Sequence, residues 1–184
     1  SSAIEPLRIA NQLTGQILFR WQVLSEDGGP VACSNGVPVM ADGAWGGTQP
    51  QGMVLVCSGV EPEGQASAAL ADWLRGLWRR GRVVGGLCTG AYALAKAGLL
   101  NGHRCTIHWE NRDSLLDEFP GLNVTEELFE IDRNRFTCAG GTSAIDMMLP
   151  RISAMAGPQV AALVTDELIH HRQREADERQ RMQL

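Results

Sequence analysis

The chain has 184 residues, of which 44% are hydrophobic and 20% are charged, and its formal net charge is −5. This length fits one domain with a sizeable core. The negative net charge argues against direct binding of duplex DNA by this chain, because such binding depends on clustered Lys and Arg. The five cysteines form no C-x-x-C pair, which argues against a disulfide framework or a zinc site. We therefore expect a cytoplasmic protein with no metal, no cofactor and no contact with membranes, since neither a secretory leader nor a spanning segment is visible.

The first part of the chain predicts one amphipathic helix and three strands. Residues 3–13 place apolar side chains on one helical face at three-residue steps. Residues 18–24 alternate as in a strand, and residues 37–40 form a second, shorter strand. The apolar run 53–57 is typical of a strand that is buried on both faces of a parallel sheet.

From residue 65 onward, helices alternate with strands. The predicted helices are 65–80, 89–97, 109–119, 142–155 and 158–171. The predicted strands are 82–87 and 104–107, followed by a hairpin of 129–132 and 135–138. This alternation predicts an α/β fold, a mostly parallel sheet between two layers of helices. Such sheets bind ligands at the carboxyl ends of their strands.

The turn Gly86-Leu87-Cys88-Thr89-Gly90 joins a predicted strand to a predicted helix. Its pattern, Gly-x-nucleophile-x-Gly, is that of a nucleophile elbow, a sharp turn that pushes one side chain clear of the sheet. The partial positive charge at the helix N-terminus would favour the thiolate of Cys88. Cys88 is therefore a candidate catalytic residue, although a glycine-rich turn with a small buried thiol remains the alternative.

His108 ends the next predicted strand and is followed by Trp109 and Glu110. Because strand ends converge at one edge, His108 could serve as base or hydrogen-bond partner of Cys88, and it is the second catalytic candidate. The alternative is a histidine that is simply satisfied at a strand end. An aromatic face beside a carboxylate can hold an amine or quaternary ammonium group. Equally, Trp109 could pack as a hydrophobic staple and Glu110 could stabilise a helix N-terminus.

Two further strand ends contribute candidate residues. Residues 139–142 offer backbone N–H groups to an anion, although an ordinary N-cap at Thr142 or Ser143 explains them as well. Gly59 follows the apolar run 53–57, and its N–H could face the thiol. The predicted ligand-binding residues are Gly59, Cys88, Thr89, His108, Trp109, Glu110 and Thr142.

The run GGLCTGAYALAKAGLLNG at residues 85–102, with Thr-Ile-His-Trp-Glu at 106–110, resembles the N-terminal domain of AraC-type bacterial transcription regulators. That domain has a ThiJ/PfpI-like, class I glutamine amidotransferase-like fold, and residues 3–11 and 138–146 resemble the same group. The resemblance implies a flavodoxin-like sandwich over residues 1–171 that senses a small-molecule effector and forms a homodimer. Regulators with this Thr-x-His-Trp-Glu run resemble those of amino-acid or quaternary-amine breakdown, such as arginine, carnitine or glycine betaine.

The charged tail at residues 172–184 resembles the linker that leads, in that family, to a helix-turn-helix domain. DNA would then be bound only through that further domain. From the residues alone, the tail is a linker or a frayed helix.

The sequence departs from the enzymes of this superfamily. Thr89 stands where PfpI-type proteases have a histidine, and the spacing from Cys88 to His108 resembles the deglycase branch instead. The glutamate which that branch places after its first strand cannot be identified here, so no intact Cys-His-acid triad can be read. We therefore predict a non-enzymatic sensing domain. The alternatives are a stand-alone ThiJ/PfpI-like hydrolase or deglycase that uses Cys88, and a redox sensor in which Cys88 is oxidised.

Overall fold

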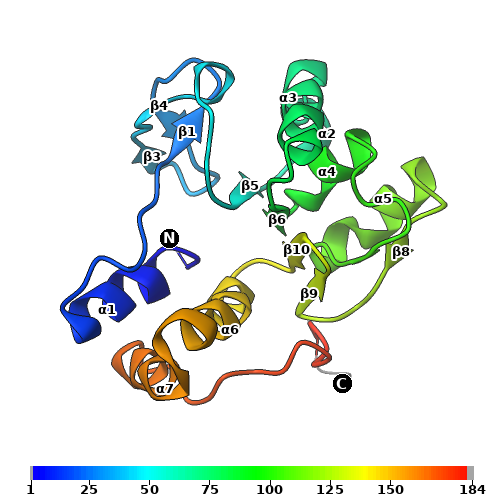
Figure 1. Ribbon diagram of the computed structural model, residues 1–184. Coiled ribbons are helices and arrows are strands. Elements are labelled where there is room, and N and C mark those ends of the chain that lie inside the picture. Colours follow the sequence, from blue (N-terminus) through cyan, green and yellow to red (C-terminus); the bar gives the residue numbers. More distant parts are fainter. Residues whose placement is uncertain (1, 182–184) are drawn as a thin grey trace.

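A four-stranded sheet forms the centre of the computed structural model, which describes residues 2–181 (Figure 1). The strands lie in the order β5 (Val54–Ser58), β6 (Val84–Cys88), β10 (Arg135–Cys138) and β9 (Phe129–Asp132). The first three are parallel, and β9 pairs with β10 as the predicted antiparallel hairpin. The register pairs Ser58 with Cys88 and Cys138 with Leu87, so the carboxyl ends of the three parallel strands lie together, at what we call the carboxyl edge of the sheet.

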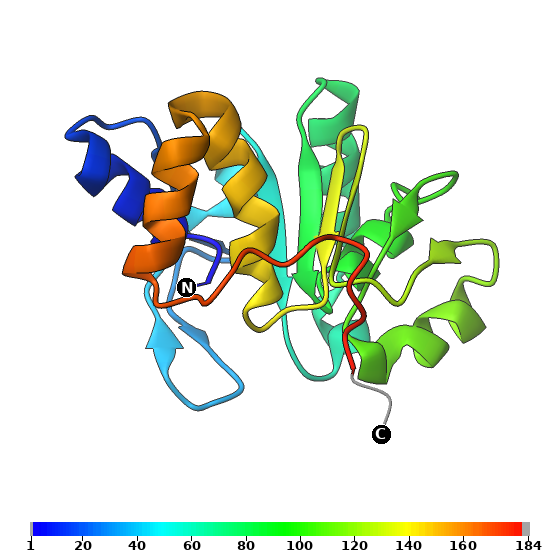
Figure 2. The ribbon, with the colours of Figure 1, turned by 90° about the horizontal axis from the view of Figure 1, so that it is seen from below.

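Helices cover both faces of this sheet, as Figure 2 shows. One face carries α2 (Pro62–Gln65), α3 (Ala68–Arg79), α4 (Ala91–Lys96) and α5 (Arg112–Glu118). The other face carries α1 (Glu5–Thr14), α6 (Ser143–Ala156) and α7 (Pro158–Glu167). Within residues 2–181 no helix is both long enough and apolar enough to cross a bilayer.

The side chains at the start of β5 pack alternately into the two layers. Val54 and Val56 pack with the α3 and α4 cluster, while Met53 and Leu55 pack with the cluster to which α6 contributes. This two-sided packing confirms the predicted three-layer α/β sandwich. Within the described residues β5 is an edge strand, so it is half-buried where the sequence predicts burial on both faces.

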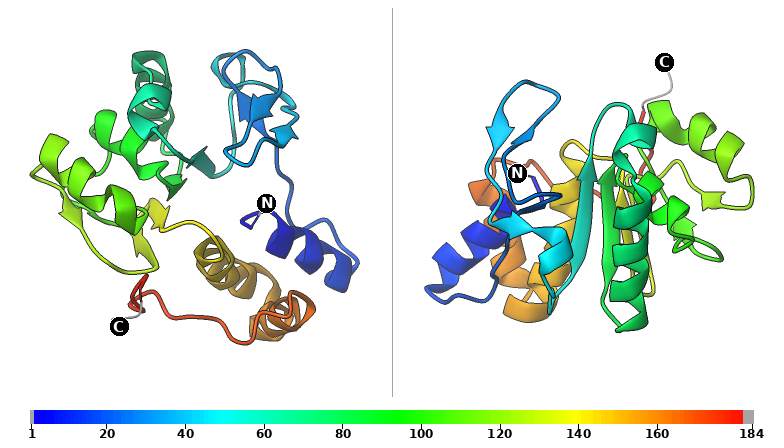
Figure 3. Two further views of the ribbon diagram at one scale, coloured as in Figure 1. Left: turned by 180° about the vertical axis from the view of Figure 1, so that it is seen from behind. Right: turned by 90° about the horizontal axis from the view of Figure 1, so that it is seen from above.

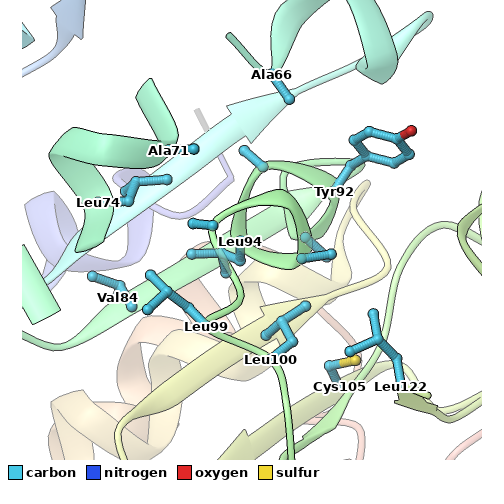
Figure 4. Close-up of a cluster of buried hydrophobic side chains, with 14 of the residues drawn as sticks. Ala66, Ala71, Leu74, Val84, Tyr92, Leu94, Leu99, Leu100, Cys105 and Leu122 are labelled. Carbon is cyan, nitrogen blue, oxygen red and sulfur yellow. The ribbon is translucent and has the colours of Figure 1, made fainter. Parts of the chain in front are cut away.

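Figure 4 shows the apolar cluster between the sheet and helices α3 and α4. Leu74, Leu94 and Leu100 have 0% of their surface exposed, and full burial of each leucine stabilises the fold by roughly 2 kcal/mol. Tyr92 lies at the edge of this cluster, and its hydroxyl donates a hydrogen bond to Glu118, which ties α4 to α5. This packing holds the connection from β6 to α4 in one place.

The remaining strands have two residues each. They pair as β1 (Leu24–Ser25) with β4 (Gly43–Ala44), β2 (Val31–Ala32) with β3 (Pro38–Val39), and β7 (Arg104–Cys105) with β8 (Asn123–Val124). Two 3-10 helices are η1 (Trp45–Gly47) and η2 (Trp109–Asn111). The predicted strand 104–107 is thus shorter than expected, and the predicted helix 109–119 is divided into η2 and α5. Both views in Figure 3 show the small strands of residues 24–44 apart from the central sheet.

The predicted strand at residues 18–24 is wrong, because only Leu24 belongs to a strand. The backbone before it is bonded by a side chain rather than by a neighbouring strand. Asn11 Oδ1 accepts the N–H groups of Leu18 and Phe19, each at 2.9 Å. An alternating pattern shows which face a strand would bury, but a strand also needs a partner for its backbone groups.

Helix α7 ends at Glu167, and residues 172–181 run toward the carboxyl edge of the sheet as a non-helical segment with a turn at 176–177 (Figure 2). The predicted helix 158–171 is therefore shorter than expected, and the frayed-helix alternative for the tail is wrong over residues 172–181. That residues 172–184 link to another domain stays a prediction, and residues 182–184 lie outside the described part of the chain.

Candidate functional site

The turn after β6 has the geometry of the predicted nucleophile elbow. Cys88 has a φ of 58°, a left-handed conformation that costs a non-glycine residue roughly 1–2 kcal/mol. Close approach requires the flanking glycines. A Cβ on Gly90 would lie 2.0 Å from the carbonyl oxygen of Val56, and one on Gly86 would lie 2.4 Å from the nitrogen of Ala91. The start of α4 therefore lies directly against β5 and β6, with the thiol at the edge of the sheet.

The loop after β10 closes the site on another side. A Cβ on Gly140 would lie 2.9 Å from the Cys88 sulfur, and Gly140 has a φ of 92°. Only glycine combines this backbone conformation with this close approach. Ser143 Oγ donates a hydrogen bond to the Gly140 carbonyl at 2.7 Å, which fixes the loop to the start of α6. The backbone of this loop is thereby set against the thiol.

The surroundings of the Cys88 thiol disfavour its ionisation. Burial raises the pKa of Cys88, the backbone N–H of Thr89 opposes that rise, and the carboxylate of Glu110 adds to it. The donor at the helix N-terminus favours the thiolate as predicted, but the cost of removing a charged sulfur from water outweighs it, so the net shift of the pKa is upward.

We expect Cys88 to react slowly with iodoacetamide at neutral pH and faster as the pH rises, since the thiolate is the reactive species. Cys33 is exposed and serves as the accessible reference within the same chain. Timed alkylation followed by peptide mass spectrometry gives both rates. Equal rates for the two cysteines at neutral pH would contradict the raised pKa.

His108 lies beside the elbow, and its backbone makes the contact. Its N–H donates to the Cys88 carbonyl at 3.4 Å, which brings the end of this segment to the thiol turn as predicted. The imidazole Nδ1 accepts the N–H of Glu110 at 3.4 Å and lies 3.7 Å from the Glu110 Oε2. Within residues 2–181 no hydrogen bond joins the imidazole to the thiol, so their catalytic pairing stays a prediction.

Trp109 forms an aromatic face next to His108. Its side chain is 42% exposed, and the two ring centroids lie 5.6 Å apart. The guanidinium carbon of Arg181, from the tail, lies 4.2 Å from the Trp109 ring centroid, well within the range of a cation–π attraction. Glu110 follows on the same rim with an exposed side chain. The aromatic face is present and a cation of the chain itself lies on it, while its combination with the Glu110 carboxylate stays a prediction.

Thr89 and Gly59 are joined directly by a hydrogen bond. Thr89 is 2% exposed, and its Oγ1 donates to the Gly59 carbonyl at 2.5 Å. This bond ties the loop after β5 to the elbow, so Thr89 shapes the site from beneath its surface. The Gly59 N–H makes no hydrogen bond within the described residues, and its role toward the thiol stays a prediction.

Thr142 is engaged by the tail. Its Oγ1 accepts a hydrogen bond from Arg174 Nη2 at 2.7 Å. Arg174 is held in turn by the carboxylate of Asp146, which accepts its N–H at 2.7 Å, its Nε at 3.0 Å and its Nη2 at 2.8 Å. His170 Nε2 lies 2.9 Å from the same carboxylate, and Asp146 has 0% of its surface exposed. Thr142 thus helps to anchor the tail.

This Asp146 cluster was not predicted from the sequence. The available signal was a single acid within the apolar run 144–149, since a buried carboxylate requires partners. The partner could not be named, because Arg174 is 28 residues away in the chain.

The tail is held at the sheet edge by further bonds. Gln180 Nε2 donates to Thr106 Oγ1 at 3.0 Å and to the Glu127 carbonyl at 3.1 Å. The Leu128 N–H donates to the Glu178 carbonyl at 2.9 Å. The last described residues therefore reach the aromatic face on a well-anchored backbone.

Two sizeable cavities lie away from these residues. One of about 680 Å³ lies between α6, α7 and residues 171–173, and one of about 270 Å³ lies between α3 and the turn after α4. None of the predicted site residues lines either cavity. The site is assigned instead from the convergence of Cys88, His108 and Trp109 at the strand ends, where parallel sheets bind ligands.

Similarity to known proteins agrees with this geometry. The chain is 47% identical over 183 residues to the HTH-type transcriptional regulator CdhR of Pseudomonas aeruginosa. The alignment covers 100% of this chain and 54% of that relative. The chain is 40% identical over 184 residues to GbdR, an HTH-type transcriptional regulator of the same species, covering 100% of this chain and 50% of the relative. The chain therefore spans about half the length of these relatives.

The crystal structure of an AraC family transcriptional regulator from Pseudomonas putida has the same fold. It superposes with a TM-score of 0.79 at 29% identity, covering 91% of this chain and 90% of that one. These matches confirm the resemblance that residues 85–110 carry. The profile of the DJ-1/PfpI family matches residues 3–154. With most of its length inside that match, and with the sandwich and the elbow in place, this chain belongs to the DJ-1/PfpI family.

Proposed function

We propose that this chain is the effector-sensing domain of an AraC-type transcription regulator, and that its effector is a small molecule with a cationic group, an amino acid or a quaternary amine. Similarity over the whole chain to regulators supports the sensing role. In this proposal the protein acts in the cytoplasm as a homodimer and reaches DNA through a domain outside this chain. Sedimentation equilibrium measures the dimer directly.

We infer the chemical class of the ligand from the contact between Arg181 and Trp109. A ring that holds a guanidinium at 4.2 Å has the exposure and orientation to hold another cation. The Glu110 carboxylate on the same rim supplies the opposite charge. A small cationic effector would therefore compete with Arg181 for this face. Displacement of Arg181 would loosen the end of the tail, and we propose that this change is the signal.

Thermal unfolding tests the proposal, because a ligand that binds only the folded state stabilises it by RT ln(1 + [L]/Kd). We expect arginine, carnitine or glycine betaine to raise the melting temperature of the chain. Trp109→Ala should abolish that rise, while Trp21→Ala, which removes another half-exposed tryptophan, should preserve it. Arg181→Ala should tighten binding by roughly two- to fivefold, the size of an exposed cation–π contact.

Two outcomes would contradict this proposal. A melting temperature that rises equally in the chain and in Trp109→Ala would place the ligand elsewhere. Weaker binding by Arg181→Ala would mean that Arg181 helps to hold the ligand and does not compete with it.

A cysteine-dependent hydrolase or deglycase is the second candidate function. The strained elbow favours it, since Cys88 keeps its φ of 58° at the edge of the sheet. The raised pKa of Cys88 and the engagement of His108 Nδ1 by a backbone N–H favour the sensing role instead. Turnover that disappears in Cys88→Ala is the result that would decide for the enzyme.

A further inference from the structure

The cavity of about 270 Å³ lies at the opposite end of the sheet from Cys88. Arg135, one of its lining residues, begins β10 and pairs in register with Val84, the first residue of β6. Cys88, by contrast, is the last residue of β6. A ligand in this cavity would therefore be separate from the effector site.

Arg135 is a buried cation without an acidic partner. It is 2% exposed, its Nε donates to the Leu99 carbonyl at 2.6 Å, and its Nη1 donates to Asn134 Oδ1 at 2.8 Å. Within residues 2–181 its Nη2 makes no hydrogen bond, and no carboxylate lies within ion-pair distance. Asp132, the acid whose charge reaches it, is already paired with Arg133 at 3.0 Å. Its guanidinium carbon lies 5.7 Å from the centroid of the Trp78 ring, so Arg135 has an aromatic partner but no anionic one.

Two further arginines line the cavity. Arg75 and Arg79 are four residues apart on α3 and line the same cavity, as does His103. Arg75 is paired with the exposed Asp72, while Arg79 has no ion pair among the described residues. The lining includes no acidic residue.

Burial and neighbouring positive charges lower the pKa of two groups that line the cavity. Burial, followed by the charge of Arg133, lowers the pKa of Arg135. Burial lowers the pKa of His103 as well, and the charges of Arg135 and Arg133 add to this effect, against a rise due to Asp132. These charges disfavour protonation of the imidazole, whose Nδ1 lies 3.5 Å from Asp132 Oδ2.

We propose that this cavity binds a phosphate-type oxyanion, either inorganic phosphate or a phosphomonoester. Guanidinium groups bind phosphate oxygens through paired, charge-assisted hydrogen bonds. Arg135 Nη2 supplies one donor from the buried wall, and Arg79 supplies a cation from the rim. The cavity has room for the anion together with several waters, each of which takes about 30 Å³ of liquid volume.

The test follows the imidazole signals of His103 by NMR while phosphate is added at constant ionic strength against chloride. We expect a saturable shift and a rise in the pKa of His103, because a bound anion offsets the charges of Arg133 and Arg135. Glycerol phosphate, titrated in the same way, separates the two sources. Tighter binding of the ester identifies an organic phosphate, and tighter binding of the inorganic anion identifies phosphate itself.

Arg79→Gln is the informative variant, because Arg79 is exposed and its loss leaves the buried Arg135 bonds in place. It should weaken phosphate binding by about tenfold, as expected for one charged hydrogen bond. Arg80→Gln is the matched control, since Arg80 is exposed beside it but does not line the cavity, and its effect should stay within about twofold. Shifts that do not saturate, or equal weakening by both variants, would overturn the proposal.

Discussion

Replacement of Gly90 by alanine should destabilise the fold by at least about 3 kcal/mol. The backbone of Gly90, at φ −60° and ψ −21°, suits any residue, so conformation contributes nothing to this cost. The cost comes from space, because the new Cβ would lie 2.0 Å from the Val56 carbonyl oxygen and 3.0 Å from the nitrogen of Leu87. These are backbone atoms of β5 and β6, which cannot move without separating the elbow from the sheet.

Urea denaturation followed by circular dichroism measures this effect. Gly121→Ala is the matched control, because a Cβ there meets nothing within 4 Å, and its effect should stay within about 0.5 kcal/mol. If Gly90→Ala unfolds at the same urea concentration as the unsubstituted chain, the tight elbow described above is incorrect.

Asp146→Asn should cost about 3 kcal/mol and release the tail. The carboxylate of Asp146 has no exposed surface and accepts three hydrogen bonds from Arg174, with His170 beside it. An amide of the same shape offers one acceptor oxygen in place of two and carries no charge. The guanidinium of Arg174 would then lose its one ion pair among the described residues, and residues 172–181 would lose a buried anchor.

Hydrogen exchange separates tail release from general unfolding. In Asp146→Asn the amides of residues 172–181 should exchange faster than in the unsubstituted chain. The amides of β6 and β10 should keep the same ranking of exchange protection among themselves. The control is Asp166→Asn on the exposed side of α7, which should leave the tail unchanged. Unaltered exchange in the tail of Asp146→Asn would show that other contacts suffice to hold it.

This anchored tail gives the sensing proposal a physical route. Asp146 holds the tail near residue 174, Gln180 holds it at the sheet edge, and Arg181 lies on Trp109. Asp146 and Gln180 hold the tail through hydrogen bonds, whereas the contact of Arg181 with Trp109 is exposed. A ligand on Trp109 therefore competes with the weakest of these three contacts. A site that signals needs such an exchangeable contact, whereas a catalytic thiol needs a base, which the described hydrogen bonds of Cys88 do not include.

The elbow could be predicted from the sequence because its signal is local. The glycines at positions 86 and 90 flank the cysteine within one turn, and the backbone contacts that require them follow from the crossing of a strand and a helix. The hairpin was predictable for the same reason, with Arg133 at its turn in a left-handed conformation, φ 58°.

The failures depended on partners far away in the chain. Residues 18–24 have the alternation of a strand, but Asn11 takes their backbone N–H groups. The linker role of the charged tail stays a prediction, but its contacts could not be predicted, since Gln180 bonds to Thr106, which is 74 residues earlier. The raised pKa of Cys88 likewise depends on burial, which the three-dimensional packing determines. None of these is encoded in a local pattern.

The most direct test of the sensing account is saturation-transfer NMR on a mixture of arginine, carnitine and glycine betaine, recorded repeatedly over hours. We expect one of the three to receive saturation from the chain and from Cys88→Ala, and to lose it with Trp109→Ala. All three ligand signals should persist undiminished. A signal that disappears with the chain but persists with Cys88→Ala would show a cysteine-dependent reaction and contradict the account.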